Sequence, residues 1–472
     1  MDRRKFFRNG TLFTLGSAFL NPFETIAQHP DISTTLKGKK TKNIIVLVSD
    51  GMSSGTLNMA DLYLNRKTGK GSNWLNLYRE NKVNRALMDM ASASSIVTDS
   101  AAASSSWGSG FRVKNGSLNI GVNGEEYLPI WQKFKKAGKM AGCVTTVPIT
   151  HATPAGFCVN SKSRNSQPEI AESYLKIKFD VLMGGGLQYF DSSLRSDKKD
   201  IFGAYESNGY QVVKTRNEML ATVSDQPILG VFYEDGLPYS IDRENVKDLS
   251  NAVPTLAEMT QKAIDRMKNH KEGFVLQVEG GKVDWAAHAN DIAGLLYDQV
   301  AFDEAIKVAI DFAEKDGNTL IIITSDHGNA NPGIIYGSTS NDHFDSIQHF
   351  KHTNEWILNG FNPNSSLSQI KERIEFANGF ALNDEEAKTI LSYYEGLKKE
   401  DSGLYNYKNL PYKAFAEMQK SRTSVGWISM DHSADYTELA MFGPGSENLK
   451  PFIKNTDLHY FMLNAAEVEN KF

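Results

Sequence analysis

The chain has 472 residues and a formal net charge of -5, and 40% of its residues are hydrophobic. This length and composition suit one large α/β domain or two smaller ones. The negative balance excludes a polyanion-binding role, so we predict that the protein has no nucleic-acid-binding surface.

The N-terminal segment has the features of an export signal. Arg3 and Arg4 precede two phenylalanines, and the short, weakly apolar stretch TLFTLGSAFL follows. This stretch is too short to span a bilayer as a mature helix, and the paired arginines resemble a twin-arginine signal, which carries folded cargo. We therefore expect residues 1–30 to direct export to the periplasm or the cell exterior. Residues 31–472 then form the mature chain, without a membrane span.

Short apolar runs that end in acids or glycines recur along the mature chain. They are NIIVLVSDG (43–51), MAGCVTT (140–146), DVLMGGG (180–186), GFVLQVEGG (273–281) and TLIIITSDHGN (319–329). Helical patterns lie between them, for example over 253–269 and 291–317. This alternation predicts an α/β fold with a large, mainly parallel sheet covered by helices on both faces. Ligands bind beyond the carboxyl ends of the strands in such sheets.

The last third of the chain breaks this rhythm. Residues 341–422 are polar, aromatic and helix-rich, so we interpret them as an insertion or cap over the sheet edge. The strand-like YTELAMFG (436–443) and an apolar final helix, LHYFMLNAAEV, follow. The two cysteines, Cys143 and Cys158, could be joined in an exported protein, but two free buried thiols are the favoured interpretation.

The stretch VTDSAAASSSWGSG (97–110) places a serine directly after an acid, at the start of an alanine run. Thr98 or Asp99 can cap a helix here, so that Ser100 lies in its first turn. Backbone N–H groups and the helix dipole favour an anion at that place, which suits a phosphate or a serine that becomes an alkoxide. On its own, the stretch is more typical of an ordinary Ser/Ala-rich helix start.

Four acids and three histidines lie at predicted strand ends or in the turns after them: Asp50, Glu279, Asp284, His288, Asp326, His327 and His432. Asp284 and His288 are four residues apart, so on a helix they share a face and can hold one metal ion. Each motif alone also fits a surface pair, an Asx turn or a structural histidine. Mixed Asp/His sites suit Zn²⁺ and carboxylate sites suit Mg²⁺, and two zinc ions about 4 Å apart can clamp an in-line phosphoryl displacement. A serine beside such a cation becomes an alkoxide, so Ser100 is the predicted nucleophile.

Six motifs occur in the order and approximate spacing of the alkaline phosphatases: VSDGM, TDSAAA, THATPAG, VEGGKVDWAAH, SDHGN and DHSADYTE. The resemblance covers residues from about 43 to 445, nearly all of the 31–472 domain. It implies a large central sheet between helices. It also implies a metal-dependent enzyme that hydrolyses small-molecule phosphate monoesters through a covalent phosphoserine. A homodimer is one expectation for the oligomeric state.

The resemblance further implies a role for each site residue, with Ser100 as the nucleophile. Three ligand sets follow from it: Asp284, His288 and His432 for a first zinc; Asp50, Asp326 and His327 for a second zinc; and Asp50, Thr153 and Glu279 for magnesium. Arg164 resembles the arginine that grips the phosphate, with Asp99 placed to orient it. The alternative is that Arg164 is a solvated loop residue and that Lys162 holds the phosphate.

Two positions vary within the family. His151 and Trp285 lie where other members carry Asp or His, and Lys or His, respectively. Those side chains reach the phosphate or the magnesium shell through water, so we count His151 and Trp285 among the substrate-binding residues. Trp285 cannot supply a cation, which leaves the metal preference of the third site open, and it could equally be a packing residue.

Other functions predict different residues. A sulfatase of the same superfamily requires a Cys/Ser-x-Pro-x-Arg motif, and TDSAAAS lacks both the proline and the arginine. A phosphodiesterase could share both zinc sites but would not need the magnesium ligands or Arg164. A non-catalytic exported binding protein that used the metals only as structural clips would tolerate the loss of Ser100.

Overall fold

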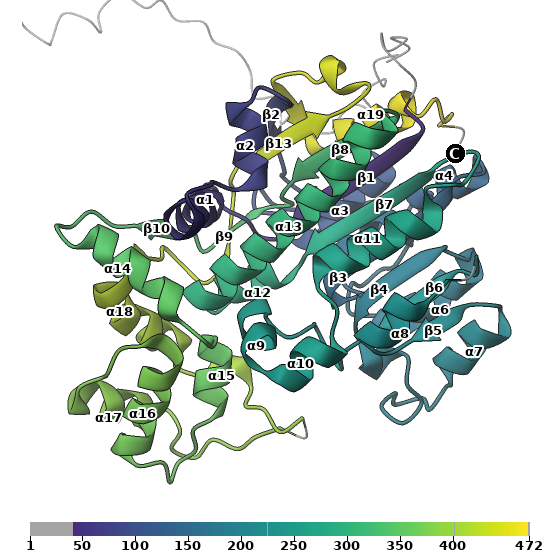
Figure 1. Ribbon diagram of the computed structural model, residues 1–472. Helices are drawn as coiled ribbons and strands as arrows, with labels where there is room; N and C mark the ends of the chain where they lie inside the picture. The colour runs from purple at the N-terminus through teal and green to yellow at the C-terminus, as the bar shows by residue number, and fades with distance from the viewer. Residues whose placement is uncertain (1–40, 224, 401, 471–472) are drawn as a thin grey trace, which may run out of the picture. The chain divides into compact units, whose positions relative to one another are not determined.

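The computed structural model describes residues 41–470 except residues 224 and 401 (Figure 1). The predicted export signal, residues 1–30, lies outside the described residues. None of the helices in the described part of the chain is long and apolar enough to cross a membrane.

A ten-stranded sheet forms the centre of the fold, in the order β14-β2-β13-β8-β1-β7-β3-β4-β6-β5. Its strands are β1 (Asn43–Ser49), β2 (Asn84–Asp89), β3 (Met140–Pro148), β4 (Val181–Gly185), β5 (Gln211–Val213), β6 (Ile228–Val231), β7 (Phe274–Gly280), β8 (Thr319–Thr324), β13 (Thr437–Phe442) and β14 (Phe452–Lys454). Strand β13 runs antiparallel to β2 and β8, and every other pairing is parallel. The predicted mainly parallel sheet is therefore confirmed.

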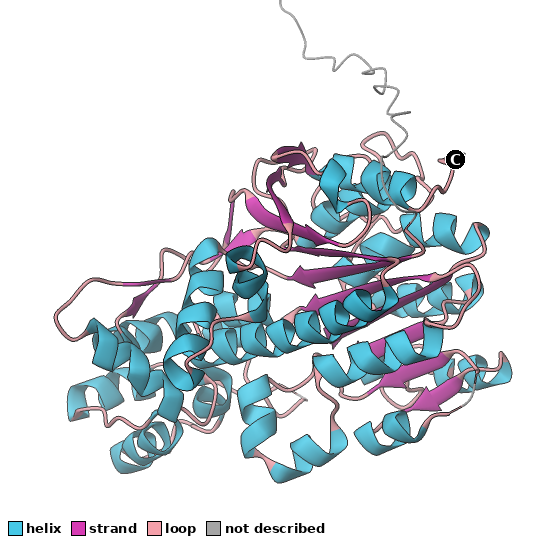
Figure 2. Cartoon of the chain, turned by 45° about the horizontal axis from the view of Figure 1, so that its top comes forward, coloured by secondary structure: helices cyan, strands magenta, loops and turns pink. Residues whose placement is uncertain are grey.

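Helices cover both faces of this sheet, as Figure 2 shows. Along β1, Ile45 and Leu47 pack into one apolar layer, whereas Ile44 and Val46 pack into the other, because successive side chains of a strand point to opposite faces. The first layer includes α1 (Ser54–Thr68), α2 (Asn73–Arg79), α8 (Arg216–Ala221), α9 (Ser240–Asn245), α11 (Leu256–Met267), α12 (Lys282–His288) and α13 (Ile292–Asp316). The second includes α3 (Ser100–Ser109), α4 (Ile130–Lys136), α5 (Ala152–Cys158), α6 (Gln167–Ile177), α7 (Ile201–Ser207) and α19 (Asn455–Ala465).

The helix boundaries follow local signals in the sequence. Thr255 begins α11 with a capping box, in which its hydroxyl accepts from the Glu258 N–H and the Glu258 carboxylate accepts from the Thr255 N–H. Helix α13 begins after Asp291, whose carboxylate accepts from two N–H groups of the first turn, and ends at Gly317 in the left-handed conformation. The helices expected over 253–269 and 291–317 are both present.

The segment expected to be an insertion is helical. It contains α14 (Ser340–Ser346), α15 (Asn354–Asn359), α16 (Leu367–Asn378), α17 (Asp384–Ser392) and α18 (Tyr412–Thr423). Helices α15 to α18 enclose an apolar cluster of their own, against which Ala289 packs just after α12. Two short strand pairs connect this region to the sheet: β9 (Gly328–Asn329) with β12 (His432–Ser433), and β10 (Gly333–Ile334) with β11 (Val425–Gly426).

The two cysteines lie inside the second helical layer. Cys143 on β3 and Cys158 at the end of α5 are free and buried, with their Sγ atoms 3.6 Å apart. Two reduced thiols, rather than a disulfide, therefore fill this part of the core.

Candidate metal centre

Acidic side chains meet at the carboxyl ends of three neighbouring strands. Strand β1 lies between β7 and β8 and is parallel to both, so the three chains turn out of the sheet at the same edge. Asp50 follows β1, Glu279 lies at the end of β7, and Asp326 follows β8; all three are fully buried. Acids from motifs that are far apart in the sequence thus form one cluster, at the edge where α/β sheets bind ligands.

A glycine after β1 allows this close approach. Gly51 has φ +67, and a Cβ atom built on it would lie 2.4 Å from Oδ1 of Asp284 on α12. The Gly51 N–H also donates to Oδ1 of Asp326, at 3.0 Å. Any side chain at position 51 would therefore separate the groups that the strand ends bring together.

Three histidines point the same ring nitrogen into the cluster. Nδ1 of His288 lies 2.6 Å from the Met430 carbonyl, and Nδ1 of His432 lies 3.0 Å from the Thr98 carbonyl. Nδ1 of His327 likewise faces a carbonyl, that of the following glycine. Since a carbonyl only accepts, each Nδ1 carries the hydrogen and each Nε2 presents a lone pair. Backbone carbonyls are the usual partners that orient metal-binding imidazoles.

These lone pairs face one another, and this arrangement fits a bound cation. Nε2 of His288 lies 3.1 Å from Nε2 of His432, and Asp284 Oδ2 lies 3.4 Å from the same His288 nitrogen. Asp326 Oδ2 and Glu279 Oε1 are buried without a hydrogen-bond partner. Acceptor atoms that are buried, crowded and unpaired cost free energy unless a cation lies between them, so the donor set fits divalent metal ions.

The potential ligand atoms form three groups whose members lie within 4.8 Å of one another: Asp284, His288 and His432; Asp50, Asp284 and His327; and Asp50, His151 and Glu279. The first is the set expected for the first zinc. In the second, Asp284 takes the place expected for Asp326, whose Oδ2 lies 3.3 Å from His327 Nε2. In the third, His151 joins the two carboxylates. Thr153, the remaining ligand expected there, donates from Oγ1 to Asp50 at 3.3 Å.

Burial and mutual repulsion dominate the electrostatics of this cluster. Burial, and then the nearby Asp326 and Asp284, raise the pKa of Asp50 well above its ordinary value. Burial raises the pKa of Glu279 to about 7 and lowers the pKa of His327 to about 4. Such a concentration of acids held together at neutral pH requires positive charge to balance it.

Ser100 lies at the start of α3 and faces the same cluster. Asp99 is the N-cap of this helix, and its Oδ1 accepts from the Ala102 N–H at 2.9 Å. The buried Ser100 Oγ lies 3.2 Å from Nε2 of His327 and 3.5 Å from Oδ1 of Asp50. The alanine run lets α3 pack closely against α5, so the hydroxyl is held at the potential metal ligands rather than at the surface.

Arg164 also points into the site, whereas Lys162 is exposed. The guanidinium donates from Nη1 to Asp99 Oδ2 at 3.1 Å and from Nη2 to His151 Nε2 at 3.0 Å. Asp99 thus holds both the first turn of α3 and the arginine. These contacts favour Arg164 over Lys162 as the residue that grips the phosphate.

His151 and Trp285 lie together beside this arginine. Their ring centroids are 6.2 Å apart and the rings are nearly perpendicular, at 79°. His151 Nδ1 is buried without a hydrogen-bond partner, close to Asp50 and Glu279. His151 therefore contacts both the arginine and the third group of potential ligands.

Two residues of this site were not identified from the sequence. Thr145 on β3 donates from its hydroxyl to Glu279, and Asn329 on β9 donates to Oδ1 of Asp284 at 2.7 Å. A polar residue inside the buried run MAGCVTT was a signal for Thr145. The role of Asn329 depends on the pairing of β9 with β12, which no local pattern reveals.

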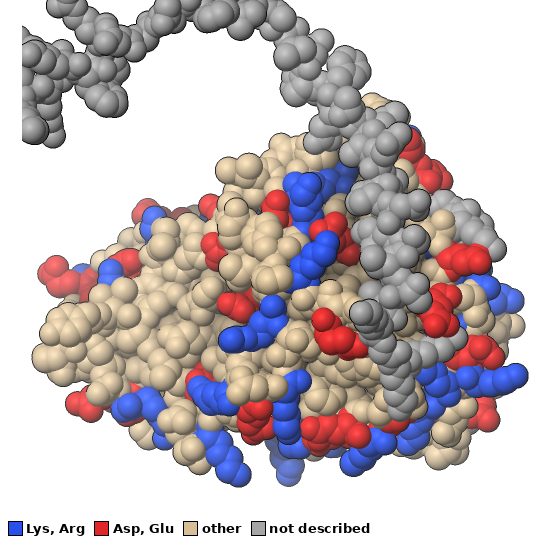
Figure 3. Space-filling view, turned by 90° about the horizontal axis from the view of Figure 1, so that it is seen from above, with Lys and Arg blue, Asp and Glu red and all other residues tan. Residues whose placement is uncertain are grey.

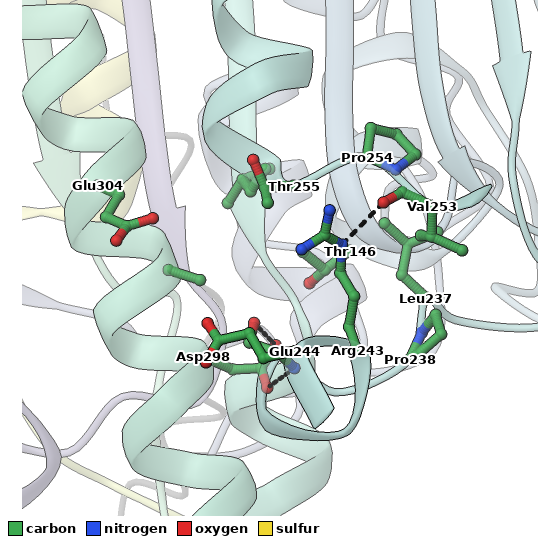
Figure 4. A pocket seen from close by; sticks show the side chains of 13 residues that line it. Thr146, Leu237, Pro238, Arg243, Glu244, Val253, Pro254, Thr255, Asp298 and Glu304 are labelled. Carbon is green, nitrogen blue, oxygen red and sulfur yellow. Dashed lines mark hydrogen bonds between the residues drawn. The ribbon is translucent and has the colours of Figure 1, made fainter. Parts of the chain in front are cut away.

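A small cavity of about 30 Å³ has none of the potential ligands among the residues that line it (Figure 4). It is lined by Thr146, Leu237, Arg243 and Asp298, among others. Its volume suits ordered water rather than a phosphate ester, so it is not the substrate site. On the face shown in Figure 3, Lys and Arg side chains are interspersed with Asp and Glu side chains.

Comparison with known proteins agrees with this geometry. The sequence profile of the alkaline phosphatase family matches residues 41–468. Alkaline phosphatase 4 of Bacillus subtilis is 31% identical over 422 residues, which cover 88% of this chain and 87% of that protein. Alkaline phosphatase of Escherichia coli is 31% identical over 339 residues, which cover 63% of this chain and 72% of that protein.

Solved structures give the same result. The crystal structure of Thermus thermophilus alkaline phosphatase matches with a TM-score of 0.85 at 31% identity, over 96% of each chain. A cold-active alkaline phosphatase from Shewanella sp. shares the fold, with a TM-score of 0.76 at 24% identity over 90% of this chain and 99% of that one. The family profile spans nearly all of the described residues, and the chain belongs to the alkaline phosphatase family of metal-dependent phosphate hydrolases.

Proposed function

We propose that the protein is an exported alkaline phosphatase that hydrolyses phosphate monoesters through a covalent phosphoserine at Ser100. The observation that carries this proposal is the position of the Ser100 hydroxyl, which lies at a helix start beside His327 and Asp50, while the preceding Asp99 holds Arg164. A nucleophile, a set of potential metal ligands and a guanidinium therefore converge on one point, as phosphoryl transfer requires.

Two zinc ions and one magnesium ion are the metals that we propose. Asp284, His288 and His432 would hold the first zinc, Asp50, Asp326 and His327 the second, and Asp50, Thr153 and Glu279 the magnesium. When bound, these ions supply Lewis-acid polarisation of the phosphoryl group and lower the pKa of attacking oxygens. His151 lies beside Asp50 and Glu279 at the third site.

The protein's own residues would divide the reaction into two displacements. Ser100 Oγ loses its proton and forms a bond to phosphorus as the bond to the leaving alcohol breaks. Water then attacks the phosphoserine, which releases inorganic phosphate and restores the Ser100 hydroxyl. Arg164 would grip two phosphoryl oxygens side by side, while Asp99 holds the guanidinium in orientation.

The contacts of Arg164 favour monoesters over diesters. A monoester dianion presents three non-bridging oxygens, whereas a diester replaces one gripped oxygen with its second substituent. A phosphodiesterase, the second candidate, would not need this guanidinium. A non-catalytic binding protein would not need a serine hydroxyl 3.2 Å from His327 Nε2.

A colorimetric assay on matched aryl phosphate mono- and diesters, with and without chelator, tests the proposal. We expect chelator-sensitive hydrolysis that strongly prefers the monoester. Full activity in a sample shown to be metal-free would refute the metal-dependent reaction, and a preference for the diester would favour the phosphodiesterase.

We also propose export by the twin-arginine route, which deletion of residues 1–30 should abolish. Light scattering of the purified protein tests the homodimer.

A further inference from the structure

A buried lysine lies behind the phosphate site, between two aromatic rings. Lys282 is only 4% exposed. Its Nζ lies 3.7 Å from the ring centroid of Tyr239 and 4.5 Å from that of Trp285. The ammonium makes no hydrogen bond or ion pair with any described residue, so the two ring faces are its nearest partners, and it also interacts electrostatically with the carboxyl groups of Asp235 and Asp298. A cation buried in this way is costly unless those contacts hold it in place.

The indole of Trp285 is partly buried, and a loop packs against another part of it. A Cβ atom built on Gly236 would lie 2.8 Å from Cζ3 of the indole, so only glycine leaves room for the ring. The loop that carries Gly236 is fixed because the Leu237 N–H donates to the Thr146 carbonyl at 2.8 Å. The Thr146 hydroxyl in turn accepts from the Lys282 N–H at 3.1 Å. Lysine, loop and strand end therefore form one rigid support for the indole.

The indole transmits this support to the phosphate site. It meets His151 edge to face, and His151 Nε2 accepts from Nη2 of Arg164. A displaced indole would free the His151 ring to turn, and the guanidinium would lose one of its two side-chain partners. The path from the buried cation to the arginine thus has three direct contacts, from lysine to indole, from indole to imidazole and from imidazole to guanidinium.

We propose that Lys282 is a positioning residue which, clamped with Tyr239, holds Trp285 as a wall of the phosphate pocket and so keeps His151 against Arg164. This inference rests on the proposed phosphatase function. It assigns no chemical step to Lys282, which touches neither the substrate nor the potential metal ligands. We therefore expect its effect on the phosphate site to require the indole.

The test is a double-mutant cycle between Lys282 and Trp285. Lys282→Met and Lys282→Arg are made in the wild type and in Trp285→Ala, and all proteins are kept metal-loaded. kcat and KM are measured on an aryl phosphate, and the Kd of inorganic phosphate is measured by calorimetry. In the wild type, we expect Lys282→Met to weaken phosphate binding and raise KM about three- to tenfold, with a smaller change in kcat. Lys282→Arg should restore both to within about twofold, since a guanidinium also stacks on aromatic rings.

In the Trp285→Ala background, Lys282→Met should change neither quantity by more than about twofold. An equal loss in both backgrounds would overturn the proposal, since Lys282 would then act without the indole. Lys214→Met is the matched control: its ammonium lies 4.0 Å from the Phe202 ring, in the second helical layer, and its loss should leave KM and phosphate affinity unchanged.

A second variant tests the proposal even if Lys282→Met fails to fold. Gly236→Ala leaves Lys282 in place but pushes on the edge of the same indole, next to the lysine stem, and should also weaken phosphate binding; unchanged affinity in that variant would overturn the proposal. The two readouts also separate this inference from the proposed function. A wild type that binds inorganic phosphate but hydrolyses no monoester would refute the phosphatase, while the phosphate affinities would still decide the role of Lys282. A wild type that binds no phosphate would refute both.

Discussion

Nε2 of His288 lies 3.1 Å from Nε2 of His432, and the Nδ1 of each ring is committed to a backbone carbonyl. Two lone pairs held face to face repel each other unless a cation separates them. The backbone thus fixes a geometry that is favourable only in the metal-loaded protein.

Metal removal should therefore lower stability as well as activity. We expect chelation to abolish monoester hydrolysis and to lower the Tm, since a ligand present at a hundred times its Kd stabilises a fold by about 2.7 kcal/mol. Zinc with magnesium should restore both, and calcium should not. Calorimetry and metal analysis of the same samples check this, and an unchanged Tm in verified metal-free protein would contradict it.

Ser100→Ala should separate chemistry from folding. The substitution removes only the hydroxyl that faces His327 and Asp50, so zinc content and Tm should stay close to those of the wild type. Turnover should fall by several orders of magnitude, and no phosphoryl group should be trapped on the protein at acid quench. Ser106→Ala is the control, since Ser106 is buried in the same helix but bonds only to the Ala102 carbonyl. Phosphate still trapped on Ser100→Ala would show that another residue is the nucleophile.

Arg164→Ala should discriminate between substrates. Loss of a charge-assisted contact to a phosphoryl oxygen costs about 1.5–3 kcal/mol, so kcat/KM for a monoester should fall about ten- to a hundredfold. The matched diester with the same leaving group should lose far less. The exposed Lys162→Ala serves as the comparison and should affect neither substrate. Equal losses of kcat/KM on both esters would show that Arg164 does not grip the phosphate.

A buried lysine far from the metal ligands makes stability depend on pH. Lys133 on α4 donates to Asn470 and contacts Nε2 of His459, and burial lowers its pKa to about 8. Because this folded-state pKa lies below the ordinary value of 10.5, Lys133 stabilises the fold above pH 10.5, and that contribution is lost as the pH falls through about 8.

Lys133→Met removes the free-energy cost of holding a charged lysine in the folded core at lower pH. Relative to the wild type, the variant should gain up to about 3 kcal/mol in unfolding free energy between pH 10.5 and pH 7. Urea denaturation at several pH values measures the difference. The exposed Lys114→Met should show no such trend. A difference between Lys133→Met and the wild type that did not vary with pH would show that Lys133 has the same pKa in the folded and the unfolded chain.

The parts of the fold that sequence patterns predicted are those with continuous local signals. Strands β1, β3, β4, β7 and β8 are fully or almost fully buried, so each appears as an apolar run. The edge strand β14 and its neighbour β2 were not predicted, because they expose side chains such as Phe452 and Leu87. Strand β5 has three residues, too few for a periodic pattern.

The candidate site divides in the same way. Asp284 and His288 could be paired from their spacing on one helix, whereas His432 reaches them only through the pairing of β12 with β9. The support around Trp285 could not be predicted either. Tyr239 and Gly236 belong to a loop whose position depends on a backbone hydrogen bond to β3. Roles set by long-range contacts need the folded chain.

The alternation of side chains along β1 ties the core to the chemistry. A one-residue deletion within this strand would turn Ile45 and Leu47 toward the opposite helical layer, and the same slip would swing Asp50 away from His327. A one-residue shift in the register of β1 would thus disrupt both the packing of the core and the candidate site. We therefore expect a change in the length of this strand to abolish folding and activity together.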